Sequence, residues 1–133
     1  MIKFLKKYFL SIFVILIIFI LCFMDTTPLP APAISNFDKY VHVIMFLILS
    51  GVVFFDNTYY LRFPISKMQI FWSIFLFPAI LAGLIEIMQE YLTTTRFGDW
   101  LDFLFGVIGT FFGLMIALSY NRYILLNKQK SKK

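Results

Sequence analysis

The segment MQIFWSIFLFPAILAGLI, from Met68 to Ile85, contains no charged residue. Its length is close to the ~20 mainly apolar residues that a helix needs to cross ~30 Å of hydrocarbon. Three further segments share this character, so the sequence predicts helices over about 8–24, 38–56, 68–92 and 100–121. We therefore expect an all-α membrane bundle of four transmembrane helices with short loops, forming a single domain over 1–133.

The composition excludes an ordinary soluble domain. Hydrophobic residues make up 61% of the chain and charged residues 14%, and the mean hydropathy is +0.87. Soluble globular domains are typically about one quarter charged. A chain with so few charges could not cover its surface with polar groups, so lipid is its expected solvent.

The basic residues predict the orientation in the membrane. The formal net charge is +5, but no basic groove pattern or nucleic-acid motif is present, so nucleic acid is not an expected partner. All basic residues except Lys39 and Arg96 fall in the N-terminal segment, the second connection and the C-terminal tail. Alternating helices put these three regions on one side, and an excess of Lys and Arg marks the cytoplasmic side. We expect both termini to be cytoplasmic.

The first apolar segment has a second interpretation. Lysines, an apolar stretch and then Ala31-Pro32-Ala33 imitate a secretory signal with its cleavage site. The stretch is longer than a usual signal core, which favours a retained helix; cleavage would leave three helices in the same orientation. Cys22 lies in this stretch and is the only cysteine, so no intramolecular disulfide can form. We expect a lipid-facing or packed thiol.

Ionisable and polar residues gather at the outer end of the predicted bundle. They come from the second helix, the third helix and the last connection with the helix that follows it, and comprise Asp38, Lys39, His42, Glu86, Gln89, Glu90, Arg96, Asp99 and Asp102. Asp38 and His42 are four residues apart and share a helix face. Glu86 shares a face with Gln89 and Glu90 in the same way. The sequence predicts one polar cluster from these faces.

Glu86 is the hardest of these residues to explain as a structural group. It lies ~9 Å of helix below Leu92, at ~1.5 Å per residue. An ionisable group at such depth is costly unless it is paired or hydrated, and by default it marks a functional site. Arg96 has an alternative role as a clamp that pairs with Glu86 or Asp102. Lys39 is expected to be an ordinary interfacial residue.

Small residues on the fourth helix are expected to serve packing. Gly106, Gly109 and Gly113 mark one side of this helix, and such spacing lets two backbones approach closely. Gly83 on the third helix is the expected opposing contact. Pro78 is expected to kink the third helix, with the freed backbone groups satisfied inside the bundle.

The ordered set of these residues resembles the VanZ-like family of small bacterial membrane proteins. The resemblance covers over half the chain and is carried by Asp38-Lys39, His42, Phe46, Gly83, Glu86, Gln89, Arg96, Asp102 and Gly109. No single piece is specific, and the order and spacing carry the resemblance. The chain departs from the family pattern at Gly106, where the family usually has asparagine, which leaves open whether the family's activity is kept.

The resemblance implies a role in the bacterial cell envelope. The family is named for a protein linked to low-level resistance to the glycopeptide teicoplanin. The resemblance also implies a multi-pass protein of the bacterial inner (cytoplasmic) membrane. The residues that match the family's polar positions form the expected ligand-binding site: Asp38, His42, Glu86, Gln89, Arg96 and Asp102.

Four functions fit the sequence to different degrees. The favoured one is binding of a polar, lipid-linked or wall-derived ligand at the outer leaflet, with Arg96 and Lys39 on a phosphate or carboxylate. The second is a membrane-embedded enzyme with His42 or Glu86 as general acid or base. A structural scaffold held by salt bridges is third. A transporter is last, because ionisable residues lie at only one face of the predicted bundle.

The sequence predicts no cofactor and no metal. It contains no nucleophile motif, phosphate loop or zinc signature. Oxygen ligands from Glu86, Glu90, Asp99 and Asp102 would suit a divalent cation, but oxygen ligands alone are a weak signal. The expected partners are membrane lipid and a lipid-linked or cell-wall ligand, and the sequence is compatible with an oligomer.

Overall fold

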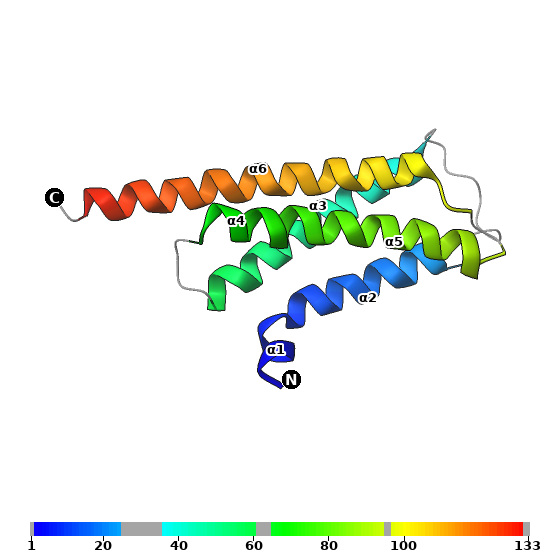
Figure 1. The fold of residues 1–133 in the computed structure, drawn as a ribbon, viewed down its shortest axis with the longest axis horizontal. Helices are drawn as coiled ribbons and strands as arrows, with labels where there is room; N and C mark the ends of the chain where they lie inside the picture. Colours follow the sequence, from blue (N-terminus) through cyan, green and yellow to red (C-terminus); the bar gives the residue numbers. More distant parts are fainter. Residues whose placement is uncertain (1, 25–35, 61–64, 95–96, 132–133) are drawn as a thin grey trace.

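The computed structural model describes residues 2–24, 36–60, 65–94 and 97–131, and every regular element in these ranges is helical. In chain order the elements are α1 (Ile2–Lys7), α2 (Phe9–Phe23), α3 (Phe37–Tyr60), α4 (Lys67–Ile70), the π-helix η1 (Phe71–Leu76), α5 (Phe77–Leu92) and α6 (Trp100–Lys130). The all-α prediction is confirmed, and the long helices run side by side as an elongated bundle (Figure 1).

In the described part of the chain, three helices are long and apolar enough to cross a membrane. They are Phe37–Tyr59, the continuous run Lys67–Leu92 through α4, η1 and α5, and Trp100–Lys130. The fourth apolar helix, α2, has only 15 residues and falls short of that length. The predicted fourth helix ends at 121, whereas α6 continues to Lys130. The extension follows from the absence of Gly and Pro beyond Asn121 and from Leu, Lys and Gln, which favour helix.

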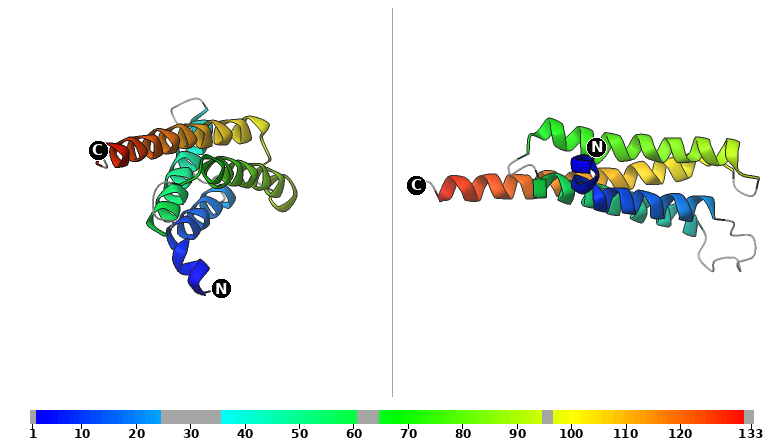
Figure 2. Two further views of the ribbon diagram at one scale, coloured as in Figure 1. Left: turned by 60° about the vertical axis from the view of Figure 1, so that its left-hand side comes forward. Right: turned by 90° about the horizontal axis from the view of Figure 1, so that it is seen from below.

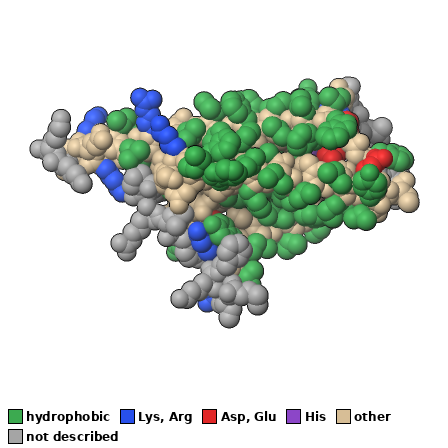
Figure 3. Space-filling view, in the orientation of Figure 1, with side chains coloured by type: hydrophobic (Ala, Val, Ile, Leu, Met, Phe, Trp, Pro, Cys, Tyr) green, Lys and Arg blue, Asp and Glu red, His purple; other side chains and the backbone are tan. Residues whose placement is uncertain are grey.

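The chain runs up and down the bundle, and α3 lies between α2 and α6 (Figure 2). The start of α2 lies toward the same side of the bundle as the end of α6, which projects beyond the other helices, and we call this side the terminal end (Figure 1). The connection between α5 and α6 lies at the opposite end, the polar end. Lys and Arg side chains lie at the terminal end, and Asp and Glu side chains lie at the polar end (Figure 3). Hydrophobic side chains cover the face between them (Figure 3). This separation is typical of a membrane protein with a positively charged side.

Glycines allow α6 to approach α3 closely. A Cβ at Gly109 would collide with the backbone carbonyl of Val43, and a Cβ at Gly113 would collide with Ser50. The packing role predicted for these glycines is confirmed, but the opposing helix is α3. Gly83, which was expected to face them, instead packs against the ring of Phe103.

Pro78 lies in the first turn of α5, directly after the π-helix η1. Proline has no N–H, so Pro78 cannot donate the usual helical hydrogen bond to the carbonyl of Ile74, four residues earlier. The hydroxyl of Ser50 on α3 donates to that carbonyl at 2.8 Å. The expected satisfaction of the freed backbone group inside the bundle is therefore confirmed.

Two buried polar side chains form hydrogen bonds between segments at the terminal end. Asp56 on α3 accepts hydrogen bonds from the backbone N–H and hydroxyl of Ser11, at 3.0 and 2.7 Å. It thereby caps the first turn of α2, which has no side-chain cap of its own. Asn121 on α6 binds both the N–H and the carbonyl of Ile65, at 3.1 and 2.9 Å. These contacts give structural roles to Asp56 and Asn121, which lie far from the polar end.

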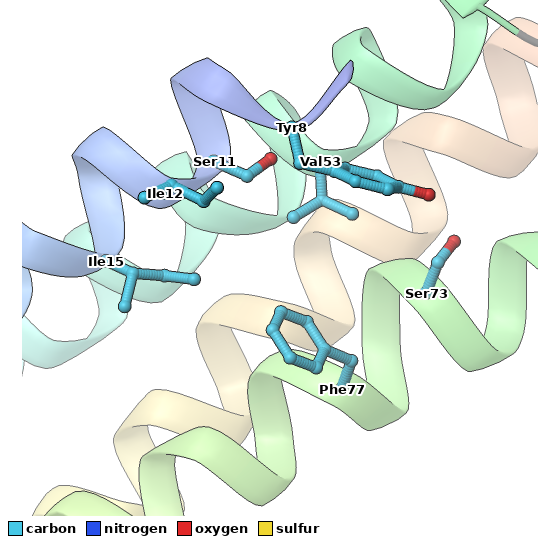
Figure 4. Close-up of a pocket in the computed structure, with 7 residues that line it drawn as sticks. All are labelled: Tyr8, Ser11, Ile12, Ile15, Val53, Ser73 and Phe77. Atoms are coloured by element: carbon cyan, nitrogen blue, oxygen red, sulfur yellow. The ribbon is translucent and has the colours of Figure 1, made fainter. Parts of the chain in front are cut away.

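An apolar cavity of about 440 Å³ also lies in the terminal half of the bundle (Figure 4). It is lined by residues of α2, α3, η1 and α5 together with the residue that precedes α2, namely Tyr8, Ser11, Ile12, Ile15, Val53, Ser73 and Phe77. Among the described residues that line it, only Tyr8 has an ionisable side chain. The cavity therefore suits an apolar chain rather than acid–base chemistry.

Candidate functional site

Lys39 is the centre of a charged cluster between α3 and α6 at the polar end. Its Nζ lies 3.2 Å from Asp38 Oδ2, 3.0 Å from Asp99 Oδ2 and 3.2 Å from Asp102 Oδ1. The Lys39 side chain is only 11% exposed, whereas those of Asp38 and Asp99 are 54% and 44% exposed. The expectation that Lys39 is an ordinary interfacial residue is wrong. Its ammonium group joins two helices and is already engaged by three carboxylates.

His42 and Glu86 face each other beside this cluster. The imidazole Nε2 of His42 lies 3.4 Å from Glu86 Oε1, and the two side chains are 4% and 8% exposed. Among the described residues, neither atom has a hydrogen-bond partner. The other ring nitrogen, Nδ1, lies 3.1 Å from the backbone carbonyl of Asp38 and 3.9 Å from Asp102 Oδ2. A carbonyl oxygen only accepts, so Nδ1 carries a proton and donates it to Asp38.

Glu86 and Glu90 also hold the connection that leads into α6. Glu86 Oε2 accepts from the backbone N–H of Asp99 at 2.9 Å, and Glu90 Oε2 accepts from that of Gly98 at 3.1 Å. A Cβ at Gly98 would meet the Glu86 carbonyl at 2.6 Å, so only glycine lets this segment lie so close to α5. One oxygen of Glu86 is thus structural, while Oε1 remains directed at His42.

Asp99 precedes α6 and serves as its N-cap. Its side chain accepts from the N–H of Leu101 at 2.8 Å. This hydrogen bond, followed by the one from Lys39, holds the pKa of Asp99 below its ordinary value. Asp99 is therefore a carboxylate at neutral pH, as its part in the Lys39 cluster requires.

One of the predicted site residues, Gln89, takes another position. Gln89 is buried, and its amide nitrogen donates to the backbone carbonyl of Cys22 at 2.8 Å. It thereby binds one of the last carbonyls of α2, which lack partners within the helix. The Cys22 side chain is buried, in agreement with the expected packed thiol. Arg96 lies outside the described residues.

A cleft of about 370 Å³ opens beside Glu86, between α5 and α6. Two carboxylates and several apolar or aromatic side chains line it, together with two glycines: Gly83, Glu86, Ile87, Glu90, Tyr91, Gly98, Trp100 and Phe103. Trp100 and Tyr91 are 78% and 81% exposed, as interfacial aromatic residues commonly are. The cleft thus combines a carboxylate lining with apolar walls.

From the predicted ligand-binding residues the structure brings together Asp38, His42, Glu86 and Asp102, and it places Lys39 and Asp99, which were predicted only for the wider polar cluster, among them. The sequence contains a partial signal for Lys39, because it directly follows Asp38 near the start of a predicted helix. Nothing local pairs it with Asp99, 60 residues later. Two groups of side chains have the composition and spacing of a cation site: His42, Glu86 and Asp102, and Asp38, Asp99 and Asp102.

No protein-family model, characterised protein or solved structure matches the chain. A function for this chain therefore has to be inferred from the residues and their geometry.

Proposed function

We propose that the chain is a VanZ-like protein of the bacterial cytoplasmic membrane that binds a polar, lipid-linked molecule of the cell envelope. The cleft between α5 and α6 is the observation that carries this proposal. Its position at the polar end allows a headgroup to reach Glu86 while a lipid chain lies against the apolar walls. The resemblance extends the proposal to glycopeptide (teicoplanin) resistance as the associated phenotype.

The charges of the site select the chemistry of the headgroup. Glu86 and Glu90 line the cleft, and carboxylates accept hydrogen bonds. They favour a headgroup that presents hydroxyl, amide or amine donors. Lys39 was expected to contact a phosphate or carboxylate, but its ammonium group is held by Asp38, Asp99 and Asp102. A sugar or peptide headgroup therefore fits the cleft better than an exposed phosphate.

Lipids that remain bound during purification test this proposal. We expect a polar-headed lipid to be extracted from the purified wild-type protein and to fall by about tenfold or more in Glu86→Gln. Loss of a charge-assisted hydrogen bond costs about 1.5–3 kcal/mol, and 1.4 kcal/mol is tenfold in affinity. Mass spectrometry of the extracts, normalised to protein, measures the change.

The matched control narrows the other cavity. Ser73 lines the apolar cavity of the terminal half, so Ser73→Leu reduces that cavity and leaves the polar end unchanged. The lipid should be retained in Ser73→Leu. Loss of the lipid in Ser73→Leu with retention in Glu86→Gln would place the ligand in the apolar cavity and refute the proposal.

The orientation belongs to the same proposal, with both termini and the terminal end in the cytoplasm and four helices crossing the membrane. In a Cys22→Ser background, single cysteines at Thr94 and Thr58 are treated with a membrane-impermeant thiol reagent in intact cells. If an outer membrane is present, it is permeabilised first. We expect Thr94→Cys to label and Thr58→Cys to remain unlabelled. The reverse pattern would put the polar end in the cytoplasm and remove the cell-wall ligand from consideration.

A membrane-embedded acid–base enzyme is the second candidate. The buried approach of His42 to Glu86 at 3.4 Å favours it, because burial and mutual contact are how proteins tune such groups for proton transfer. The lipid extracts separate the two functions. A binding protein returns the lipid unchanged, whereas an enzyme converts it in the wild type but not in His42→Ala.

A further inference from the structure

Three helices each contribute one metal-ligating side chain to the same point at the polar end. One ligand atom each from His42 on α3, Glu86 on α5 and Asp102 on α6 lies within 4.8 Å of the others. The side chains of His42 and Glu86 are more than nine-tenths buried, and Asp102 is 14% exposed. Buried carboxylates and imidazoles are normally paired or bound to a metal ion.

The atoms that face this point lack the partners that burial demands. His42 Nε2 and Glu86 Oε1 are both buried, and neither has a hydrogen-bond partner among the described residues. Because Nδ1 of His42 donates to the carbonyl of Asp38, the neutral imidazole presents a bare lone pair at Nε2. Two acceptor atoms then face each other across 3.4 Å. A positive charge between them would remove the repulsion.

The geometry suits a metal ion in that position. Two ligand atoms each about 2.1 Å from a tetrahedral ion are about 3.4 Å apart. This separation equals the 3.4 Å between His42 Nε2 and Glu86 Oε1. The hydrogen bond from Nδ1 to a backbone carbonyl is the usual support of a metal-binding histidine, because it fixes the ring and its tautomer.

The charges around the site also favour a cation. Four carboxyl groups, those of Asp38, Glu86, Asp99 and Asp102, surround the site, against one lysine side chain, Lys39. With these groups ionised and the imidazole of His42 deprotonated, as metal binding requires, the formal net charge of these described residues is −3. Lys39 already lies within the second group of acids, formed by Asp38, Asp99 and Asp102. The group with His42 has no such internal cation, so it is the one that a metal ion would complete.

We propose that His42 Nε2, Glu86 Oε1 and one carboxylate oxygen of Asp102 bind a divalent first-row transition metal ion such as Zn²⁺. The imidazole selects against Mg²⁺ and Ca²⁺, which prefer oxygen ligands. Three protein ligands leave a position for water or for an oxygen of a bound molecule, as in catalytic zinc sites. Glu86 also lines the cleft, so the ion would lie beside the bound headgroup.

This inference deepens the proposed function but can fail separately from it. A purified protein that retains its lipid and binds no metal ion would overturn the metal site alone. A protein that binds the metal ion and retains no polar-headed lipid would overturn the proposed function alone.

Direct metal titration tests the site. The wild-type protein is purified in detergent with a tag that lacks histidine, treated with a chelator and then titrated with Zn²⁺ against a chromophoric competitor. We expect one Zn²⁺ per chain, with at least about a 100-fold loss of affinity in His42→Ala, Glu86→Gln and Asp102→Asn. Outer-shell changes alone cost 10–100-fold, so loss of a ligand should cost at least as much.

Asp56→Asn is the matched control. It changes a carboxylate to an amide at the terminal end, outside the three-residue set, and the amide oxygen can still accept from Ser11, so its affinity for Zn²⁺ should equal that of the wild type. A wild-type protein that binds no Zn²⁺ would show that His42 and Glu86 form only an ion pair and would overturn the proposal. Equal affinity in the wild type and in His42→Ala would also overturn it.

X-ray absorption of the Zn²⁺-loaded wild type provides a test that needs no variant to fold. We expect imidazole and oxygen scattering at about 2.0–2.2 Å. A sulfur shell at about 2.3 Å would assign the ion to the Cys22 thiol and overturn the proposed ligand set. A shell of oxygen atoms without imidazole would overturn it as well.

Discussion

Replacing Gly109 with leucine is expected to destabilise the bundle by at least about 3 kcal/mol, the upper range for overpacked cores. A Cβ at this position would collide with the backbone carbonyl of Val43 and come within 3.1 Å of the N–H of Leu47. Backbone atoms of a helix cannot rotate away as the tip of a long side chain can. The contact between α3 and α6 is the most extensive between any two helices of the described bundle. Forcing these two helices apart would therefore affect the whole fold.

Gly51 provides the matched control, because it is an exposed glycine of α3 with nothing within 4 Å of a built Cβ. Gly51→Leu should change stability by less than about 1 kcal/mol, the scale of helix propensity alone. Thermal unfolding of both variants in detergent, followed by size-exclusion chromatography, measures the difference. Equal melting temperatures for Gly109→Leu and Gly51→Leu would contradict the close α3–α6 approach.

Replacing Lys39 with methionine is also expected to lower the stability of the fold strongly. The variant keeps most of the length of the side chain but leaves Asp38, Asp99 and Asp102 facing one another without a cation. Removing one partner of a fully buried ion pair costs about 3–5 kcal/mol. Asp38 and Asp99 keep access to water, which reduces the cost, so we expect about 2–3 kcal/mol.

Two further variants test whether the loss of stability comes from the unpaired carboxylates and not from the loss of any lysine. Lys67 is exposed on α4, and Lys67→Met should stay within about 0.5 kcal/mol of the wild type. Adding Asp102→Asn to Lys39→Met removes one of the repelling carboxylates and should restore part of the lost stability. A Lys39→Met protein as stable as Lys67→Met would show that the three carboxylates do not depend on the ammonium group.

Most of the fold's local structure could be predicted from the sequence. Uncharged runs such as 68–85 specify apolar helices, because hydrophobicity and the rise per residue are local properties. The charged residues of the chain ends and connections place the helix limits within a few residues, except at the end of α6. The packing role of Gly109 and the internal satisfaction of the backbone freed by Pro78 also follow from single helices.

The sequence predicted which residues gather at the polar end but not which of them contact one another. Helix direction alone puts Asp38, His42, Glu86 and Asp102 at the same depth, so their gathering was predictable. Their partners were not, since a contact between residues 39 and 99 depends on how α3 and α6 are rotated toward each other. The same rotation turns Gln89 to the carbonyl of Cys22 and away from a ligand.

The sequence by itself thus determined the helices, their apolar character and the end at which the ionisable groups collect, because each is set by residues near one another along the chain. Only the tertiary structure decided that Lys39 is neutralised by three carboxylates while His42 Nε2 and Glu86 Oε1 face each other without hydrogen-bond partners among the described residues. Both outcomes are set by the distances between atoms of different helices, and helix periodicity does not fix which faces meet.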